Sequence, residues 1–190
     1  MSIIPTYFLS TLWAKLPLWL YIIVVFAAFA QLWAWYKIIK EIKVAAKSGT
    51  TLTKFQMYLF LFVAISFTIK LLLQLGSTIP AVSTLAFGFR PIVIAYLHLV
   101  LLAVVSVFIL SYMYTFKLIL TGRLTLIAFC VFTIGVFLNE LVLAIQGVLA
   151  FSYIVVKYVN EILFGVSLIL LLGAILMVSS QRKSTETLVE

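Results

Sequence analysis

The chain offers few residues of the kinds that do chemistry, and only one of them is a histidine, His98. Its five acidic residues are all glutamates, and Cys130 is its only cysteine. A closed zinc site needs about four ligands, and the chain has no HExxH pattern, no Cys pair and no second His. Glycine-rich phosphate loops and a GxSxG nucleophile motif are also absent. The pattern therefore favours a chain that is not an enzyme on its own, without deciding the question.

A second group of residues is polar or ionisable and interrupts long apolar stretches. Inserting such a charge into hydrocarbon costs about 2.5 to 3.5 kcal/mol, so several at one depth should face one another or a water-filled cavity. We therefore predict a shared intramembrane polar site, made of Lys70, Gln74, Arg90, His98, Asn139, Glu140, Lys157, Asn160 and Glu161.

The elements that must position these residues are membrane-spanning helices. The chain is 66% hydrophobic and 9% charged, against roughly 45–50% and 25% in soluble domains. Five stretches have the length of about 20 residues that a span requires. The sequence predicts an all-α integral membrane helical bundle, a single transmembrane domain over residues 1–190, with spans at about 16–36, 55–75, 91–116, 124–146 and 154–178.

Three further segments are too short or too polar to span. Residues 79–87, between Pro80 and Gly88, are predicted to form a short re-entrant or interfacial segment that covers the polar site. Residues 1–15 are predicted to be an interfacial entry segment rather than a cleaved signal peptide. Residues 179–190 are predicted to form a polar cytoplasmic tail.

The basic residues predict the orientation and exclude one class of partner. Most flank the spans at alternate ends, where they act as topology signals and contact lipid headgroups rather than nucleic acid. We predict five spans in the bacterial inner (plasma) membrane, with the N-terminus outside and the C-terminus in the cytoplasm. The predicted partners are the lipid bilayer and either a second copy of the chain or another membrane subunit. The predicted cytoplasmic cations are Lys37, Lys40, Lys43, Lys47, Lys54, Lys117, Arg123, Arg182 and Lys183.

On this topology the polar residues fall within roughly 12 Å of the outer surface. Each also has a purely structural interpretation. Lys70 and Lys157 can extend to the interface, Lys157 and Glu161 are spaced for an i, i+4 pair, and the two asparagines, Asn139 and Asn160, can join helices. Glu140 lies deepest, and we predict that it is functional or paired with His98 or a lysine.

The run Phe87 to Leu102 resembles the C-terminal half of longer polytopic bacterial membrane proteins that are distantly similar to the NnrS family and to subunit I of haem-copper oxidases. The matching residues are Leu97, His98, Leu99, Leu101 and Leu102, with Ala103 where the family outline HLxxLG has glycine. The resemblance implies that His98 is a haem or copper ligand. The family's other histidines have no counterpart in this chain, so the ligand role implied by the resemblance applies to His98 only.

Three functions remain open from the sequence. The resemblance favours a redox-linked membrane protein with haem or copper at His98, tuned by Glu140 and Lys70. The polar site alone favours a transporter of a small solute or of protons. The third alternative is a non-catalytic accessory subunit whose polar residues join helices to each other or to a partner.

Overall fold

The computed structural model describes residues 18–47, 52–152, 154 and 156–186, and every regular element in them is a helix. Five segments are long and apolar enough to cross a membrane, which confirms the predicted all-α membrane bundle. The third of them is composite, because α5, η2 and α6 follow one another without a break. The elements are α2 (Leu18–Lys47), α3 (Lys54–Gly76), α4 (Pro80–Gly88), α5 (Arg90–His98), η2 (Leu99–Ser106), α6 (Val107–Thr115), α7 (Arg123–Phe151) and α8 (Val159–Glu186).

The ends of the helices follow local backbone chemistry. Helix α3 begins with a capping box, in which Thr53 Oγ1 accepts from Gln56 N and Gln56 Oε1 accepts from Thr53 N. Helix α8 begins at Val159, later than the predicted residue 154, because Tyr158 adopts a φ of 60° that no right-handed helix accommodates. It then continues to Glu186, into the segment predicted as a tail. The predicted entry segment, residues 1–15, lies outside the described residues.

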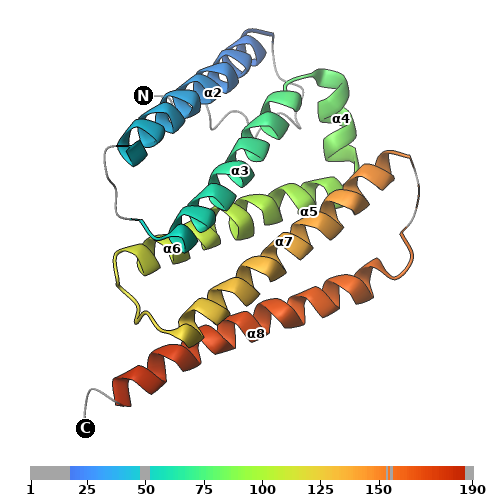
Figure 1. Cartoon of the computed structure of the whole chain (residues 1–190). Coiled ribbons are helices and arrows are strands. Elements are labelled where there is room, and N and C mark those ends of the chain that lie inside the picture. Colours follow the sequence, from blue (N-terminus) through green and yellow to red (C-terminus); the bar gives the residue numbers. More distant parts are fainter. Residues whose placement is uncertain (1–17, 48–51, 153, 155, 187–190) are drawn as a thin grey trace.

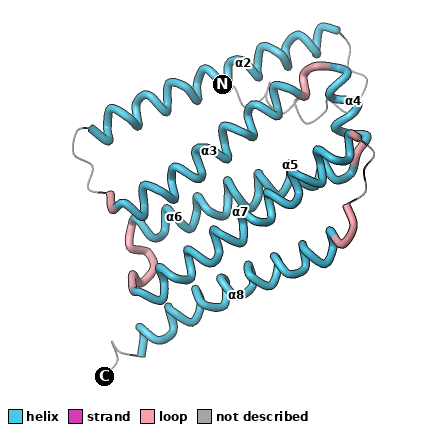
Figure 2. The backbone as a smooth tube through the Cα atoms, turned by 45° about the vertical axis from the view of Figure 1, so that its right-hand side comes forward, coloured by secondary structure: helices cyan, strands magenta, loops and turns pink. Residues whose placement is uncertain are grey.

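The spans lie side by side roughly in chain order, with the short α4 joining the ends of α3 and α5 (Figures 1 and 2). Helix α3 packs against η2 and α6, while α7 packs against α5 and most extensively against α8. The buried core therefore lies where three spans meet, and it comprises Leu59, Val63, Leu99, Ala103, Val107, Phe129 and Val136.

Helix α2 is attached to the bundle through α3. The indole Nε1 of Trp35 donates to Thr68 Oγ1 at 2.9 Å, and its ring meets Phe67 edge-on at 4.6 Å between centroids. A buried indole N–H normally finds such a partner. This contact fixes the height of α2 against α3.

Two glycines allow α7 and α8 to approach closely. A Cβ added to Gly173 of α8 would lie 2.8 Å from the backbone nitrogen of Phe132 and 2.9 Å from its Cα. A Cβ added to Gly135 of α7 would lie 2.9 Å from Leu170 Cδ2. Small residues at membrane helix contacts serve this purpose, because van der Waals packing replaces the hydrophobic effect there.

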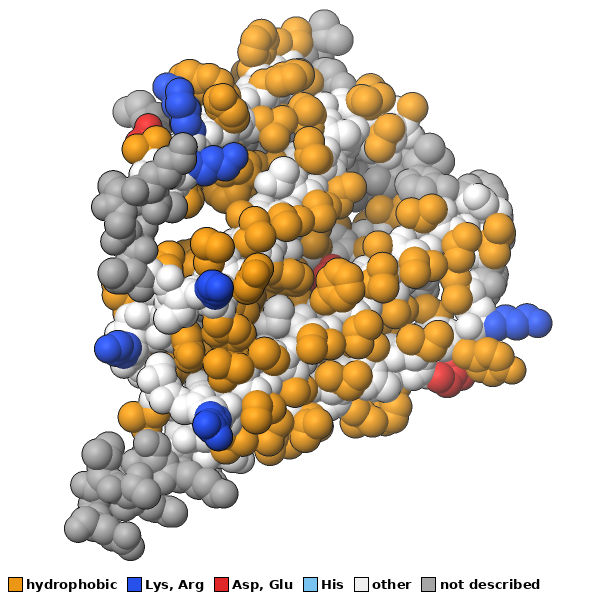
Figure 3. All heavy atoms as spheres, in the orientation of Figure 1, with side chains coloured by type: hydrophobic (Ala, Val, Ile, Leu, Met, Phe, Trp, Pro, Cys, Tyr) orange, Lys and Arg blue, Asp and Glu red, His pale blue; other side chains and the backbone are white. Residues whose placement is uncertain are grey.

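The outer surface of the bundle is mostly apolar, and the view in Figure 3 shows basic side chains gathered mainly toward one end of the helices. That end carries the end of α2, the start of α3, the end of α6 and the start of α7. Its exposed cations include Lys37, Lys40, Lys43, Lys54, Lys117 and Arg123. The helices thus bring these six of the predicted cytoplasmic cations to one end, while the orientation of that end in a membrane stays a prediction.

Candidate functional site

His98 is the last residue of α5 and lies partly buried at the point where the α-helix changes into the π-helix η2. Its Nδ1 lies 2.9 Å from the carbonyl oxygen of Ile94, one turn earlier. A carbonyl oxygen only accepts hydrogen bonds, so this contact assigns the proton of the neutral ring to Nδ1. The Nε2 atom is therefore the one that can take up a proton or bind a ligand.

Glu140 faces His98 from the neighbouring helix α7. Helices α5 and α7 touch where Ile92 packs on Gly147: a Cβ added to Gly147 would lie 3.7 Å from Ile92 Cγ1. The positions of His98 and Glu140 along their helices can be counted from this contact. The two helices run in opposite directions along the chain (Figure 1). His98 is six residues after Ile92 and Glu140 seven before Gly147, which places both about 10 Å inward from that contact. The Glu140 carboxyl group and the His98 ring lie close enough to interact electrostatically, without a direct hydrogen bond or ion pair between them.

Asn139 supports this carboxyl group from the same helix. It is buried, with 8% of its surface exposed, and its Nδ2 donates to Glu140 Oε1 at 3.4 Å. Asn139, Glu140 and His98 together form what we call the α5–α7 polar site. It is the part of the predicted polar layer in which ionisable side chains of two neighbouring spans lie within electrostatic range of each other.

Lys70 and Gln74 lie on α3, and they interact with each other. Lys70 Nζ donates to Gln74 Oε1 at 2.6 Å and lies 5.7 Å from the centroid of the Phe67 ring. Within the described residues, no acidic side chain interacts with Lys70. Of the partners predicted for Glu140, Lys70 is therefore not one that this arrangement provides.

The remaining predicted site residues lie at helix ends. Arg90 is exposed at the start of α5, and Asn160 and Glu161 are exposed in the first turn of α8. Lys157 precedes α8, so it does not share a helix with Glu161. The predicted i, i+4 pair of these two residues on one helix is therefore not formed. The structure brings none of these four residues into the α5–α7 polar site.

The π-helix η2 is a structural feature next to His98 that the sequence did not predict. It spans Leu99–Ser106 in the middle of the third span, and Ser106 Oγ donates to Leu101 O at 2.8 Å. Wider helical turns of this type are rare and frequently occur at functional sites. Its sequence, LVLLAVVS, contains no glycine or proline that would signal an irregular helix.

The donor set around His98 does not fit a complete haem or copper site. The chain supplies one histidine, and its Nδ1 is engaged by Ile94 O. In the part of the chain that the structure describes, no three His, Cys, Asp or Glu side chains come together. The chain's own residues therefore offer one nitrogen ligand, and the cofactor role implied by the resemblance stays a prediction.

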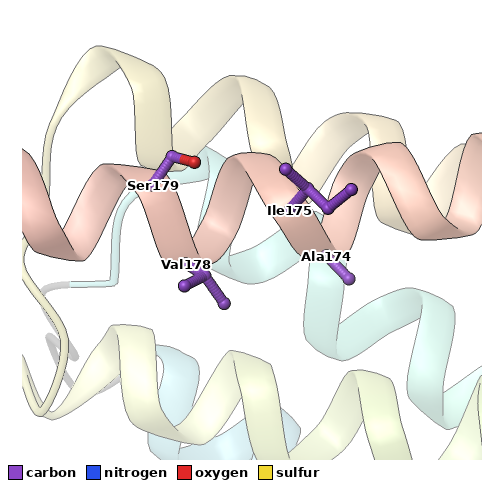
Figure 4. Close-up of a pocket in the computed structure, with 4 residues that line it drawn as sticks. All are labelled: Ala174, Ile175, Val178 and Ser179. Atoms are coloured by element: carbon purple, nitrogen blue, oxygen red, sulfur yellow. The ribbon is translucent and has the colours of Figure 1, made fainter.

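Two surface hollows are lined by none of the three residues of the α5–α7 polar site. One is formed by Ala174, Ile175, Val178 and Ser179 of α8 (Figure 4). The other is formed by Ala144, Ile145, Val148 and Leu149 of α7. Each is built by a single helix and is lined mainly by apolar side chains, as expected for grooves that contact lipid.

Comparisons with known proteins gave no assignment: no protein family, no curated protein and no solved structure matched the chain. The fold and composition therefore define the class by themselves. The chain is a multi-pass helical membrane protein with a polar site between its third and fourth spans.

Proposed function

We propose that this protein translocates protons across the membrane, and that His98 and Glu140 are the groups that hold the proton in transit. One observation carries the proposal: a carboxyl group and an imidazole lie on neighbouring spans inside the bundle, within electrostatic range of each other. Ionisable groups in membrane spans are costly, and they typically mark ion pathways and proton relays. Of the transporter alternatives, the proton is the substrate that this pair is equipped to bind.

The tautomer of His98 defines the chemistry of the relay. Because Nδ1–H donates to Ile94 O, a proton arriving at the site binds at Nε2 and forms an imidazolium ion. That cation is stabilised by the Glu140 carboxylate across the interface. Once the two side chains close to hydrogen-bond distance, transfer of this proton to the Glu140 carboxylate gives two neutral groups. Asn139 Nδ2 then keeps the carboxyl group in position. The proton can thus move from one span to the next without a persistent charge.

Hydroxyl groups on the inner part of the third span provide the continuation of the path. Ser106, Ser111 and Thr115 follow His98 along η2 and α6, and Ser111 is almost completely buried at 1% exposure. Each hydroxyl donates to a backbone carbonyl of its own helix. Their oxygen atoms retain lone pairs that can accept a proton or a water molecule.

The test measures proton influx into proteoliposomes that contain a pH-sensitive dye, driven by an imposed potassium diffusion potential. We expect Glu140→Gln to reduce the protein-dependent flux at least about tenfold, because general acid–base groups typically contribute 10²–10⁴-fold. Glu161→Gln is the matched control, because it removes a carboxylate that is exposed at the start of α8. An equal flux for wild type and Glu140→Gln would refute the proposal.

A second measurement separates loss of the relay from loss of the fold. Hydrophobic carbodiimides convert a protonated carboxyl group into a stable N-acylurea, and mass spectrometry locates the product. We expect labelling at Glu140 in the wild type, and an altered pH dependence of that labelling in His98→Gln, because the two groups interact. Identical labelling profiles in wild type and His98→Gln would show that the two groups do not share a proton.

The redox-linked alternative rests on the resemblance at His98 alone, and visible absorbance of the purified protein tests it.

A further inference from the structure

Lys70 is a partly buried cation that the proposed proton path does not use. It lies in α3, six residues before the helix ends at Gly76, or about 9 Å from that end. A charge inside a span costs about 2.5 to 3.5 kcal/mol on insertion scales, and such a group normally pairs with another. No acidic side chain among the described residues provides that pair.

The face of α3 that carries Lys70 is the one that packs into the bundle. Lys70 follows Val63 by seven residues and Ser66 by four, which places the three side chains on one side of the helix. Val63 and Ser66 are buried, and Val63 belongs to the core shared with η2 and α6. Gln74 continues the same face one turn nearer to the helix end. Lys70 thus points along the inside of the bundle toward its outer end rather than directly into lipid.

Lys70 and Gln74 both keep hydrogen-bond donors that the bond between them does not use. An ammonium group has three N–H donors and a primary amide has two. Gln74 Oε1 accepts from Lys70 Nζ at 2.6 Å, and the Phe67 ring lies on another side of the ammonium group. Among the described residues, Lys70 makes one side-chain hydrogen bond, the one to Gln74 Oε1, and the Gln74 amide N–H groups donate to no side-chain acceptor. The pair has spare donors and a net positive charge.

We propose that Lys70 and Gln74 form a binding site for a phosphate group at the outer end of α3. A phosphate group has several strong acceptor oxygens and a negative charge, which match the remaining N–H donors of the Lys70 ammonium group. The Gln74 amide oxygen accepts from that ammonium group and holds it in place. The depth fits as well, because a lysine stem of four carbons carries the ammonium group several ångströms toward the headgroup level. The phosphate belongs either to an outer-leaflet phospholipid or to free inorganic phosphate, and the experiment distinguishes them. The site shares no residue with the α5–α7 polar site, so it does not depend on the proposed function.

The test uses the full chain and two probes. Native mass spectrometry counts bound phosphatidylglycerol and, in parallel, bound phosphatidylcholine. Thermal unfolding in neutral bicelles is followed as inorganic phosphate is added. The two probes are phosphatidylglycerol and inorganic phosphate, and phosphatidylcholine, whose choline neutralises its phosphate charge, is the control lipid. We expect Lys70→Met to weaken binding of the probe that occupies the site at least about tenfold, because hydrogen bonds to charged groups are each worth about a factor of ten or more.

The variants are chosen so that every outcome is informative. Lys70→Arg keeps the charge and should retain binding. The thermal unfolding transition of Lys70→Met itself shows that this variant is folded, so a loss of binding there reports the missing ammonium group. Lys54→Met removes an exposed lysine from the other end of the same helix and should bind as the wild type does. Preference for phosphatidylglycerol identifies a lipid site, and stabilisation by inorganic phosphate identifies a soluble ligand. The proposal is overturned if Lys70→Met binds both probes like the wild type, or if Lys54→Met loses as much.

Discussion

Replacing Gly173 by alanine tests the close packing that holds α7 in place. The added Cβ would lie 2.8 Å and 2.9 Å from the backbone nitrogen and Cα of Phe132. These are backbone atoms, so no side-chain rotation relieves the clash and the two helices must move apart. Phe132 precedes Asn139 by seven residues, or about two turns, on the same helix. A shift of α7 there should therefore extend to the α5–α7 polar site.

The magnitude follows from two opposing terms. Alanine in place of glycine inside a helix stabilises by roughly 0.5–1 kcal/mol, while overpacking a tight contact costs typically about 1–3 kcal/mol. We expect Gly173→Ala to destabilise by about 1–2 kcal/mol. The matched control is Gly165→Ala on the same helix, where no atom lies within 4 Å of the added Cβ. That variant should be neutral or more stable by up to about 1 kcal/mol.

Gly135→Ala provides an intermediate case. Its added Cβ would meet the Cδ2 and Cγ atoms of Leu170, at 2.9 Å and 3.1 Å, and a leucine side chain can change its rotamer. The expected order of stability is Gly165→Ala, Gly135→Ala, Gly173→Ala, measured as reversible unfolding in mixed micelles of increasing denaturing detergent. Equal stabilities for Gly173→Ala and Gly165→Ala would refute the packing argument, because only the first introduces a contact with backbone.

Two further predictions concern the contacts of α3. Trp35→Phe removes the hydrogen bond to Thr68 Oγ1 and should destabilise the protein by about 1 kcal/mol in the same unfolding assay. The control is Trp33→Phe, at a side chain with 62% exposure, which should change stability by less than about 0.5 kcal/mol. Equal effects of the two substitutions would contradict the assignment of Trp35 as the α2–α3 contact. A double-mutant cycle of Lys70→Met with Glu140→Gln should give a coupling energy below about 0.5 kcal/mol, and a larger value would show that the two charges interact after all.

The number and nature of the spans could be predicted from the sequence because a bilayer constrains them strongly. Stretches of about 20 apolar residues have few alternatives to a helix in hydrocarbon, where every backbone group needs a partner. The start of α8 could not be predicted, since apolar residues such as Ile154 and Val156 continue the hydropathy pattern up to a break set by the backbone of Tyr158. The π-helix was equally hidden, because Leu99–Ser106 is as apolar as any regular helical segment.

The sequence also predicted that polar residues lie at similar depth, but depth alone does not decide which of them meet. Lys70 and Glu140 are on different helices, and their partners depend on the direction in which each helix turns its face. Lys70 shares a face with Gln74 and bonds to it, whereas Glu140 is turned toward α5 by the packing of Gly147 on Ile92. Helix rotation is set by such tertiary contacts, which a single sequence does not display.

This separation explains how one outer layer can carry two kinds of chemistry. A carboxylate paired directly with a lysine forms a stable ion pair, and such a pair binds neither a proton nor an anion readily, because each charge already satisfies the other. With Glu140 directed to His98 and Lys70 directed to Gln74, each group retains its own binding capacity. The placement of α7 between α5 and α8 is what maintains this arrangement, since Gly147 sets its contact with α5 and Gly135 and Gly173 set its contact with α8. Close helix packing and intramembrane chemistry are therefore linked through the position of one helix.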